Sequence, residues 1–173
     1  MRYSIDIENF DPSHEGGSAE FYSINEDKNL GFKQFRNKQS ANSAYKKQKL
    51  LSKFGLAPKV YGQICKLPIH NLDWETNWGF ITEIAKVLPE TSMKKRLKEI
   101  QSLVENIHKK TKLKFWDCHY WNVGYVKRNN KAKLVCIDTG NESFFGYCNA
   151  WGFSEPGPKC NYCNKYQCRC SKD

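Results

Sequence analysis

One loop, residues 115–122, most constrains this chain, because regular elements are predicted on both sides of it. Before the loop, Ser92–Lys110 carries apolar residues at helical spacing and basic residues in its last turn, which suits the carboxyl end of a helix. After the loop, Tyr125–Lys127 and Lys133–Ile137 predict a hairpin around Asn129-Asn130. The sequence therefore predicts a helix, a loop and a hairpin in this order.

Three polar residues stand at the ends of these elements. Asp117 and Asn122 lie in the loop, and the apolar second strand of the hairpin ends at Asp138, which Thr139 and Gly140 follow. Phosphoryl transfer needs a carboxylate that orients and accepts the proton of the attacking hydroxyl, and metal ligands that offset the phosphate charge. Asp117 fits the first role, and Asn122 and Asp138 fit magnesium ligands.

The first half of the chain predicts strands around one helix. The helix is expected over Ser40–Phe54, with Gly55 as its stop. The five expected strands are Tyr3–Ile7, Glu20–Asn25, Leu30–Phe35, Val60–Lys66 and Gly79–Ala85. Together with the later helix, they predict an α+β fold.

In this order the segments resemble the protein-kinase-like superfamily. Asp117–Asn122 looks like its catalytic loop, D-x-x-x-x-N, and Asp138–Gly140 looks like its D-F-G motif. His119 makes the loop closer to D-x-H-x-x-N, the version frequent in aminoglycoside and choline kinase-like enzymes. We expect His119 to support the loop rather than to perform acid-base chemistry, because the loop already contains a carboxylate.

The same resemblance implies a site for ATP with Mg²⁺ or Mn²⁺. Gly17–Tyr22 resembles a shortened glycine-rich loop, Gly31–Phe35 the strand that carries the phosphate-pairing lysine, and Phe80–Ile84 the strand that leads to the hinge. The implied catalytic residues are Asp117 and Lys33. The implied nucleotide-binding residues are Gly16, Gly17, Ser18, Lys33 and Glu83.

The chain length limits how much of a kinase can be present. At 173 residues the chain is shorter than a full two-lobed protein kinase, which usually needs roughly 250 residues or more. We therefore expect a five-strand antiparallel N-lobe over residues 1–86, a minimal helical C-lobe over residues 87–147 and a cysteine-rich tail over residues 148–173. Only residues 139–173 follow Asp138, too few for the usual peptide-binding helices.

Two departures from active protein kinases concern activation. No Asp or Glu occurs from residue 28 to residue 72, so the helix C glutamate that pairs with the strand lysine is missing. Lys47 or Gln48 is expected at the corresponding position, and Lys33 would be held by Gln48, by Asp138 or by the nucleotide. Phe115-Trp116 replaces the usual His-Arg pair, which argues against activation by phosphorylation.

The tail contains four cysteines with the spacing C-x2-C-x4-C-x-C. Four soft ligands so close together suit tetrahedral zinc, which can supply folding free energy to a short segment. The expected ligands are Cys160, Cys163, Cys168 and Cys170, with Cys148 as a possible substitute. Free or disulfide-linked thiols are the alternative. Cys65, Cys118 and Cys136 lie in apolar surroundings and are expected to be packing residues.

The net charge of +10 bears on partners and location. Lys94–Lys114 holds eight Lys or Arg against two Glu, which favours either a polyanionic partner or a solvated helix face. No stretch approaches the roughly 20 apolar residues of a membrane span, and the first ten residues lack the pattern of a secretion signal. We expect a cytoplasmic protein, in the host cytoplasm if the chain is viral, with no membrane partner.

Two functions from different classes follow. The first is an ATP-dependent kinase of reduced size that acts on a protein hydroxyl. The second is a pseudokinase or binding module, which would use the kinase-like fold, the basic helix and the tail to hold a protein or a nucleic acid. The absent helix C acid favours the second, whereas the presence of Lys33, Asp117, Asn122 and Asp138 together favours the first.

Overall fold

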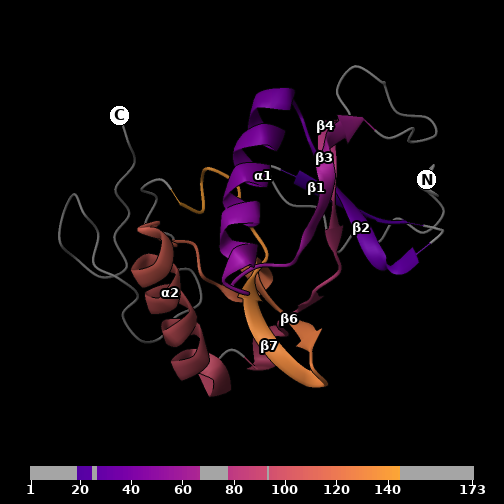
Figure 1. The fold of residues 1–173 in the computed structure, drawn as a ribbon. Helices are drawn as coiled ribbons and strands as arrows, with labels where there is room; N and C mark the ends of the chain where they lie inside the picture. Colours follow the sequence, from indigo (N-terminus) through magenta and orange to yellow (C-terminus); the bar gives the residue numbers. More distant parts are fainter. Residues whose placement is uncertain (1–18, 25–26, 67–77, 93, 145–173) are drawn as a thin grey trace. The chain divides into compact units, whose positions relative to one another are not determined.

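The computed structural model describes residues 19–24, 27–66, 78–92 and 94–144, and these form an α+β fold with antiparallel sheets (Figure 1). The expected strand at Tyr3–Ile7, the turn at Gly16–Ser18 and the cysteine tail lie outside the described residues. No helix in the described ranges is long and apolar enough to cross a membrane.

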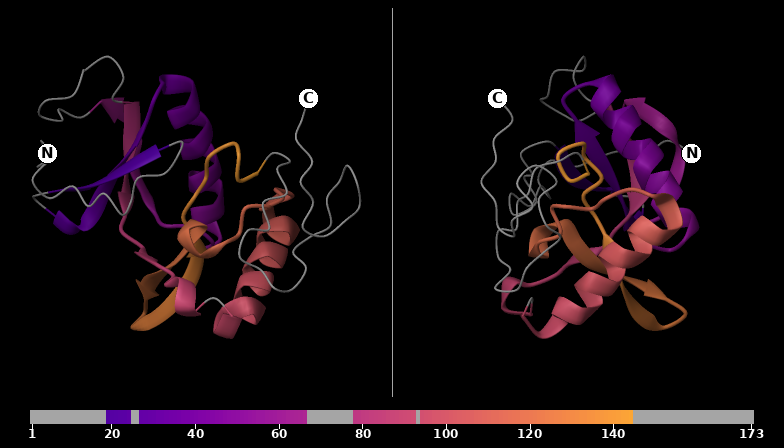
Figure 2. Two further views of the ribbon diagram at one scale, coloured as in Figure 1. Left: turned by 180° about the vertical axis from the view of Figure 1, so that it is seen from behind. Right: turned by 90° about the vertical axis from the view of Figure 1, so that its left-hand side faces the viewer.

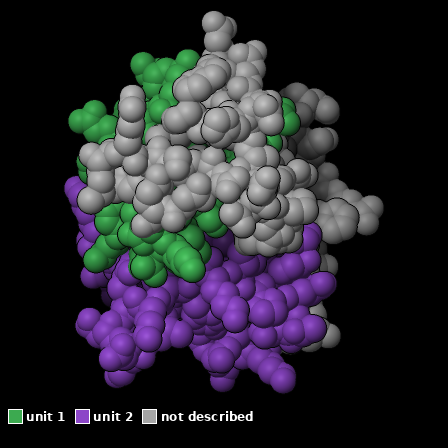
Figure 3. All heavy atoms as spheres, turned by 90° about the vertical axis from the view of Figure 1, so that its right-hand side faces the viewer, with its two compact units in different colours: residues 1–49, 59–84 green, residues 50–58, 85–173 purple. Residues whose placement is uncertain are grey.

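The chain divides into two compact units, which Figure 3 distinguishes by colour. Unit 1 comprises residues 1–49 and 59–84, and unit 2 comprises residues 50–58 and 85–173. Residues 50–58 and 85–86 therefore group with unit 2, although the sequence assigns them to the N-lobe segment, residues 1–86. Each unit has its own sheet and its own apolar core.

The sheet of unit 1 has four strands in the order β1-β2-β4-β3, and all its pairs are antiparallel. The strands are β1 (Ala19–Ile24), β2 (Asp27–Phe35), β3 (Val60–Lys66) and β4 (Trp78–Glu83). The predicted hairpin is confirmed as β1 and β2, and β3 has the predicted bounds. β2 lies between β1 and β4, and its residues from Leu30 to Phe35 are all buried. A side chain on this strand is therefore held firmly.

Helix α1 (Lys38–Lys53) covers this sheet through small and aromatic residues. Ala41, Ala44 and Tyr45 pack against Phe35 and Phe80, and the Tyr45 ring meets the Phe80 ring edge-on with centroids 5.6 Å apart. The helix was predicted over Ser40–Phe54 and begins two residues earlier, directly after Asn37. The side chain of Asn37 accepts a hydrogen bond from the Ser40 N–H at 2.8 Å, so it caps the first turn.

Helix α1 ends where the sequence places its stop. Gly55 has φ +66°, the Leu56 N–H donates to the Leu51 carbonyl at 3.0 Å, and the Gly55 N–H donates to the Ser52 carbonyl at 2.9 Å. This pair of bonds is the Schellman arrangement, which needs a left-handed residue after the helix. Glycine adopts that conformation without a Cβ penalty.

Unit 2 contains a three-stranded antiparallel sheet and helix α2 (Leu97–Thr111). The strands β5 (Lys86–Val87), β6 (Val123–Arg128) and β7 (Lys131–Cys136) follow one another in the sheet, and α2 lies beside β7 (Figure 2). The hairpin of β6 and β7 was predicted, and Asn129 and Asn130 have φ 48° and 61°. Asparagine tolerates this conformation, which the two-residue turn requires.

The predicted start of the second helix is wrong by five residues. Residues 92–110 were expected to be helical, but α2 begins at Leu97 after two short 3₁₀ turns, Glu90–Ser92 and Lys94–Arg96. Three consecutive cations oppose an α-helical start there, because the amino end of a helix carries partial positive charge. The apolar face behaves as expected: Ile100, Leu103 and Ile107 are buried in the core of unit 2.

Candidate functional site

The loop at residues 115–122 is anchored at its start by an apolar contact and a backbone bond. Phe115 is buried and stacks on Phe144, with ring centroids 5.3 Å apart. The Trp116 N–H donates to the Ser143 carbonyl at 3.0 Å. The end of the loop forms a 3₁₀ turn, Tyr120–Asn122, in which the Asn122 N–H donates to the His119 carbonyl at 3.0 Å. The loop is thus tied at both ends.

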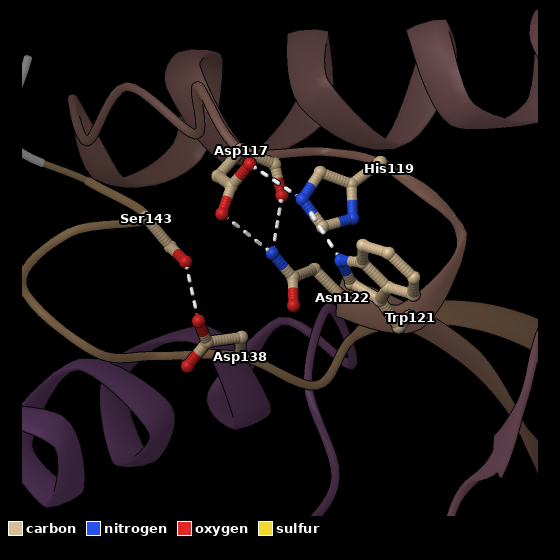
Figure 4. Close-up of polar contacts among 6 residues, drawn as sticks. All are labelled: Asp117, His119, Trp121, Asn122, Asp138 and Ser143. Atoms are coloured by element: carbon tan, nitrogen blue, oxygen red, sulfur yellow. Dashed lines mark hydrogen bonds and ion pairs between the residues drawn. The ribbon is translucent and has the colours of Figure 1, made fainter. Parts of the chain in front are cut away.

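Within the loop, Asn122 binds Asp117 directly (Figure 4). Its amide nitrogen donates to the Asp117 backbone carbonyl at 2.9 Å and to the Asp117 Oδ2 at 2.8 Å. A single side chain therefore closes the loop and orients the carboxylate.

Asp138 enters the same site from the end of β7. The backbone N–H groups of Ile137 and Asp138 both donate to the Asn122 carbonyl, at 3.0 and 3.4 Å. The Asp138 carboxylate accepts the Gly140 N–H at 2.9 Å on Oδ1 and the Ser143 hydroxyl at 2.5 Å on Oδ2. Ser143 is fully buried, so this carboxylate is held by a rigid partner.

The orientation of the Asn122 amide matters for its expected role. Because the amide nitrogen donates to two oxygens of Asp117, the amide oxygen must point the other way. Figure 4 shows this oxygen on the side of the loop where Asp138 lies. An amide oxygen and a carboxylate are the ligand types that Mg²⁺ prefers.

His119 is the other polar side chain buried in the loop. Its Nε2 lies 2.7 Å from Asp117 Oδ1 and 2.9 Å from the indole nitrogen of Trp121. Trp121 is 54% exposed, and its ring meets the imidazole edge-on with centroids 4.9 Å apart. The sequence places His119 within a motif but does not point to Trp121, because four Phe, Trp or Tyr residues occur in this loop and their spacing does not distinguish Trp121 from the others.

Two further expected site residues, Lys33 and Glu83, lie in unit 1. Lys33 is on the inner strand β2, opposite Phe80 of β4, and its side chain is buried with its amino group 5.6 Å from the centre of the Phe35 ring. At the end of β4, Glu83 binds Lys59 twice: its carboxylate accepts the Lys59 N–H at 3.0 Å, and its own N–H donates to the Lys59 carbonyl at 2.9 Å.

The two helix residues considered as substitutes for the missing glutamate have nearby partners of their own. The amide nitrogen of Gln48 donates to the Thr82 hydroxyl at 2.6 Å, and the Lys47 amino group donates to the Ser43 hydroxyl at 3.0 Å. Gln48 is almost fully buried. It therefore ties α1 to β4 within unit 1.

The cysteines within the described ranges are packing residues. Cys118 and Cys136 belong to the core of unit 2, and Cys65 packs partly buried in unit 1. Burial raises the pKa of the Cys118 thiol to about 12, and the neighbouring charge of Asp117 acts in the same direction. Burial also raises the pKa of Cys65. The tail cysteines lie outside the described residues, and the part of the chain that the structure describes holds no group of three or more His, Cys, Asp or Glu able to bind a metal ion.

No protein-family model and no curated protein matches the chain.

Proposed function

We propose that this chain is an ATP-dependent phosphotransferase of reduced size with a kinase-like fold, which transfers the γ-phosphate to a hydroxyl of a protein. The observation that carries the proposal is the role of Asn122 at the centre of the site. Its side chain binds Asp117, and its carbonyl binds the backbone of Asp138. One residue thus connects a carboxylate suited to orient a hydroxyl with a carboxylate suited to bind a cation.

The donor set fits a hard divalent cation. The Asn122 amide oxygen and the Asp138 carboxylate would hold Mg²⁺ or Mn²⁺, with phosphate oxygens and water as the further ligands. Such an ion, bound together with ATP, would offset the charge on the phosphates. Two protein ligands are enough for this kind of site, because Mg²⁺ bound with a nucleotide is usually held by one or two carboxylates plus phosphates.

Lys33 supports the nucleotide part of the proposal. Lys33 is buried, with only 9% of the residue exposed, on β2, an inner strand of unit 1, and its amino group lies beside the Phe35 ring. We assign it to the ATP phosphates, as the resemblance to kinases implies. Glu83, at the end of β4, would lie beside the adenine.

The first test measures ATP binding by thermal shift. Addition of ATP with Mg²⁺ or Mn²⁺ should raise the melting temperature of the full chain, because a ligand that binds only the native state stabilises it. Asp138→Asn should abolish the metal-dependent part of this shift, since it removes a charge from a hard-cation site with little change in volume. Glu142→Gln is the matched control, because Glu142 is an exposed carboxylate in the same loop. An equal ATP shift in Asp138→Asn and the wild type would refute the assignment.

The second candidate, a binding module, is favoured by the charge of α1. This helix contains no acidic residue, and Lys38, Lys46 and Lys49 are exposed on it. The amino groups of Lys38 and Lys66 lie 4.7 and 5.2 Å from the centre of the Trp78 ring. Cations around an aromatic ring suit a nucleic acid, which offers phosphates and bases together.

Two measurements separate the candidates. Transfer of labelled γ-phosphate to protein, lost in Asp117→Asn, would support the phosphotransferase. Salt-dependent binding of single-stranded RNA without any ATP-induced shift would support the binding module instead, because contacts to phosphates weaken steeply with salt.

A further inference from the structure

We infer that His119 carries its proton on Nε2 and that this N–H donates a hydrogen bond to Asp117 Oδ1. The other oxygen, Oδ2, is then the one that acts on the acceptor hydroxyl. The first part concerns the protein alone, and the second part rests on the proposed function. His119 is thus a positioning residue for Asp117.

The Nε2 atom of His119 lies within hydrogen-bond distance of two groups with opposite requirements. The His119 Nε2 lies 2.7 Å from Asp117 Oδ1 and 2.9 Å from the Trp121 indole nitrogen. The indole N–H can only donate, and a carboxylate oxygen can only accept. A neutral imidazole nitrogen cannot serve both partners, because Nε2 either carries a hydrogen or offers a lone pair.

Two observations favour a hydrogen bond from Nε2 to Asp117 over one from Trp121 to Nε2. As a carboxylate, Asp117 would face a bare Nε2 with lone pair against lone pair at 2.7 Å, which is repulsive, whereas a hydrogen on Nε2 makes the contact a charge-assisted hydrogen bond. At the other side of the ring, Nδ1 is buried and has no hydrogen-bond partner among the described residues. A proton on Nδ1 would leave a buried N–H unsatisfied, which is unfavourable because the group has lost its hydrogen bond to water and gains none in the protein.

The position of Trp121 is compatible with a proton on Nε2. Its side chain is half-exposed, so a rotation of the indole ring would let its N–H donate to water when Nε2 offers no lone pair. The two rings meet edge-on with centroids 4.9 Å apart, an aromatic contact that does not depend on the hydrogen bond.

The assignment distinguishes the two oxygens of Asp117. Oδ1 is buried and faces the imidazole, so a substrate cannot reach it. Oδ2 binds the amide of Asn122 and keeps a second lone pair. The acceptor hydroxyl must therefore meet Oδ2, beside the Asn122 amide (Figure 4).

The test reads the proton position directly by NMR of the full chain labelled with ¹⁵N-histidine. Two-bond ¹H–¹⁵N correlations distinguish the two neutral tautomers, and loss of signals in His119→Gln assigns this residue among the four histidines. We expect the proton on Nε2 in the wild type. A proton on Nδ1, whether alone or together with one on Nε2, would overturn the inference.

Two variants identify the partner that sets the tautomer. In Asp117→Asn the new amide must accept from Asn122 with its oxygen, so its NH₂ faces His119 and the proton should move to Nδ1. Trp121→Phe removes only the indole N–H and should leave the proton on Nε2. If Trp121→Phe moves the proton and Asp117→Asn does not, Trp121 is the partner and the inference fails.

Turnover provides the readout for positioning. A glutamine amide can replace the Nε2–H, so His119→Gln should retain most of the turnover, whereas His119→Ala should lower kcat on the order of 10- to 100-fold with little change in KM for ATP, as expected for a lost hydrogen bond to a charged group. Equal losses in both variants would contradict a role through Nε2. If the wild type carries the proton on Nε2 but transfers no phosphate, the tautomer assignment stands and the phosphotransferase proposal fails.

Discussion

Asp117 and Cys118 are neighbours in one loop, but their side chains have opposite surroundings. The Asp117 carboxylate is partly accessible and holds hydrogen bonds that orient it. The Cys118 side chain points into the core of unit 2 and is 3% exposed. At the residue scale, reactivity depends on the direction of the side chain, which alternates along an extended segment.

We expect the Cys118 thiol to be inert in the native protein. Its pKa is raised from 9.0 to about 12 by burial, so at pH 8 about one thiol in 10,000 is a thiolate, the reactive form. Iodoacetamide followed by mass spectrometry should label Cys118 only after unfolding, while the partly buried Cys65 should be labelled sooner. Fast labelling of Cys118 in the native state would contradict the packing described here.

The same thiol should affect stability at high pH. Its folded pKa lies above its unfolded value, so the neutral thiol stabilises the native state fully below about pH 9, and this contribution is lost as the pH rises toward 12.

At the scale of the element, the helix ends show how local chemistry sets boundaries. Helix α1 begins at the cap of Asn37 and ends at Gly55, and both residues are recognisable signals in a sequence. Helix α2 lacks a side-chain cap at its start, where Arg96 stands. Without such a signal, apolar periodicity alone cannot distinguish the 3₁₀ turns from the helix that follows.

Loss of the α1 cap should be measurable. Asn37→Ala should lower the free energy of unfolding by about 1 kcal/mol, because the Ser40 N–H loses its acceptor. Asn37→Asp keeps an oxygen at the same place, favours the positive end of the helix, and should restore the stability. Urea denaturation measures both variants. If alanine and aspartate were equally stable at this position, the cap would have no energetic role.

At the scale of the whole molecule, each unit relies on its own core. In unit 2, a core of aliphatic and aromatic residues connects α2, the site loop and the sheet, so Asp117, Asn122 and Asp138 rest on one packed body. In unit 1, α1 packs on the four-stranded sheet, and Lys33 is buried on strand β2 of this sheet. The cysteine tail, which follows unit 2's described part, stays a prediction.

We expect the tail to bind one zinc ion per chain through Cys160, Cys163, Cys168 and Cys170. Cys163→Ser should lower the melting temperature and the zinc content found by elemental analysis, because metal binding supplies folding free energy. Asn164→Ala, in the same tail, is the matched control and should change neither. Protein purified without added metal or chelator that contains no zinc would disprove the site.

The sequence alone determined the features that depend on local order. The β1–β2 hairpin, the bounds of β3, the stop of α1 at Gly55 and the asparagine turn between β6 and β7 all follow from side-chain pattern and turn chemistry within a few residues. The short strand β5 could not be predicted from the sequence, because two residues carry no periodicity and pair only when β6 lies beside them.

The connections between the site residues could not be predicted from the sequence for a similar reason. The sequence names Asp117, Asn122 and Asp138, but their connection depends on hydrogen bonds between the loop and the end of β7. The tertiary structure alone decided that His119 faces Asp117 and that Asn122 turns its oxygen away from it, because these orientations come from three-dimensional contacts that no spacing in the chain specifies.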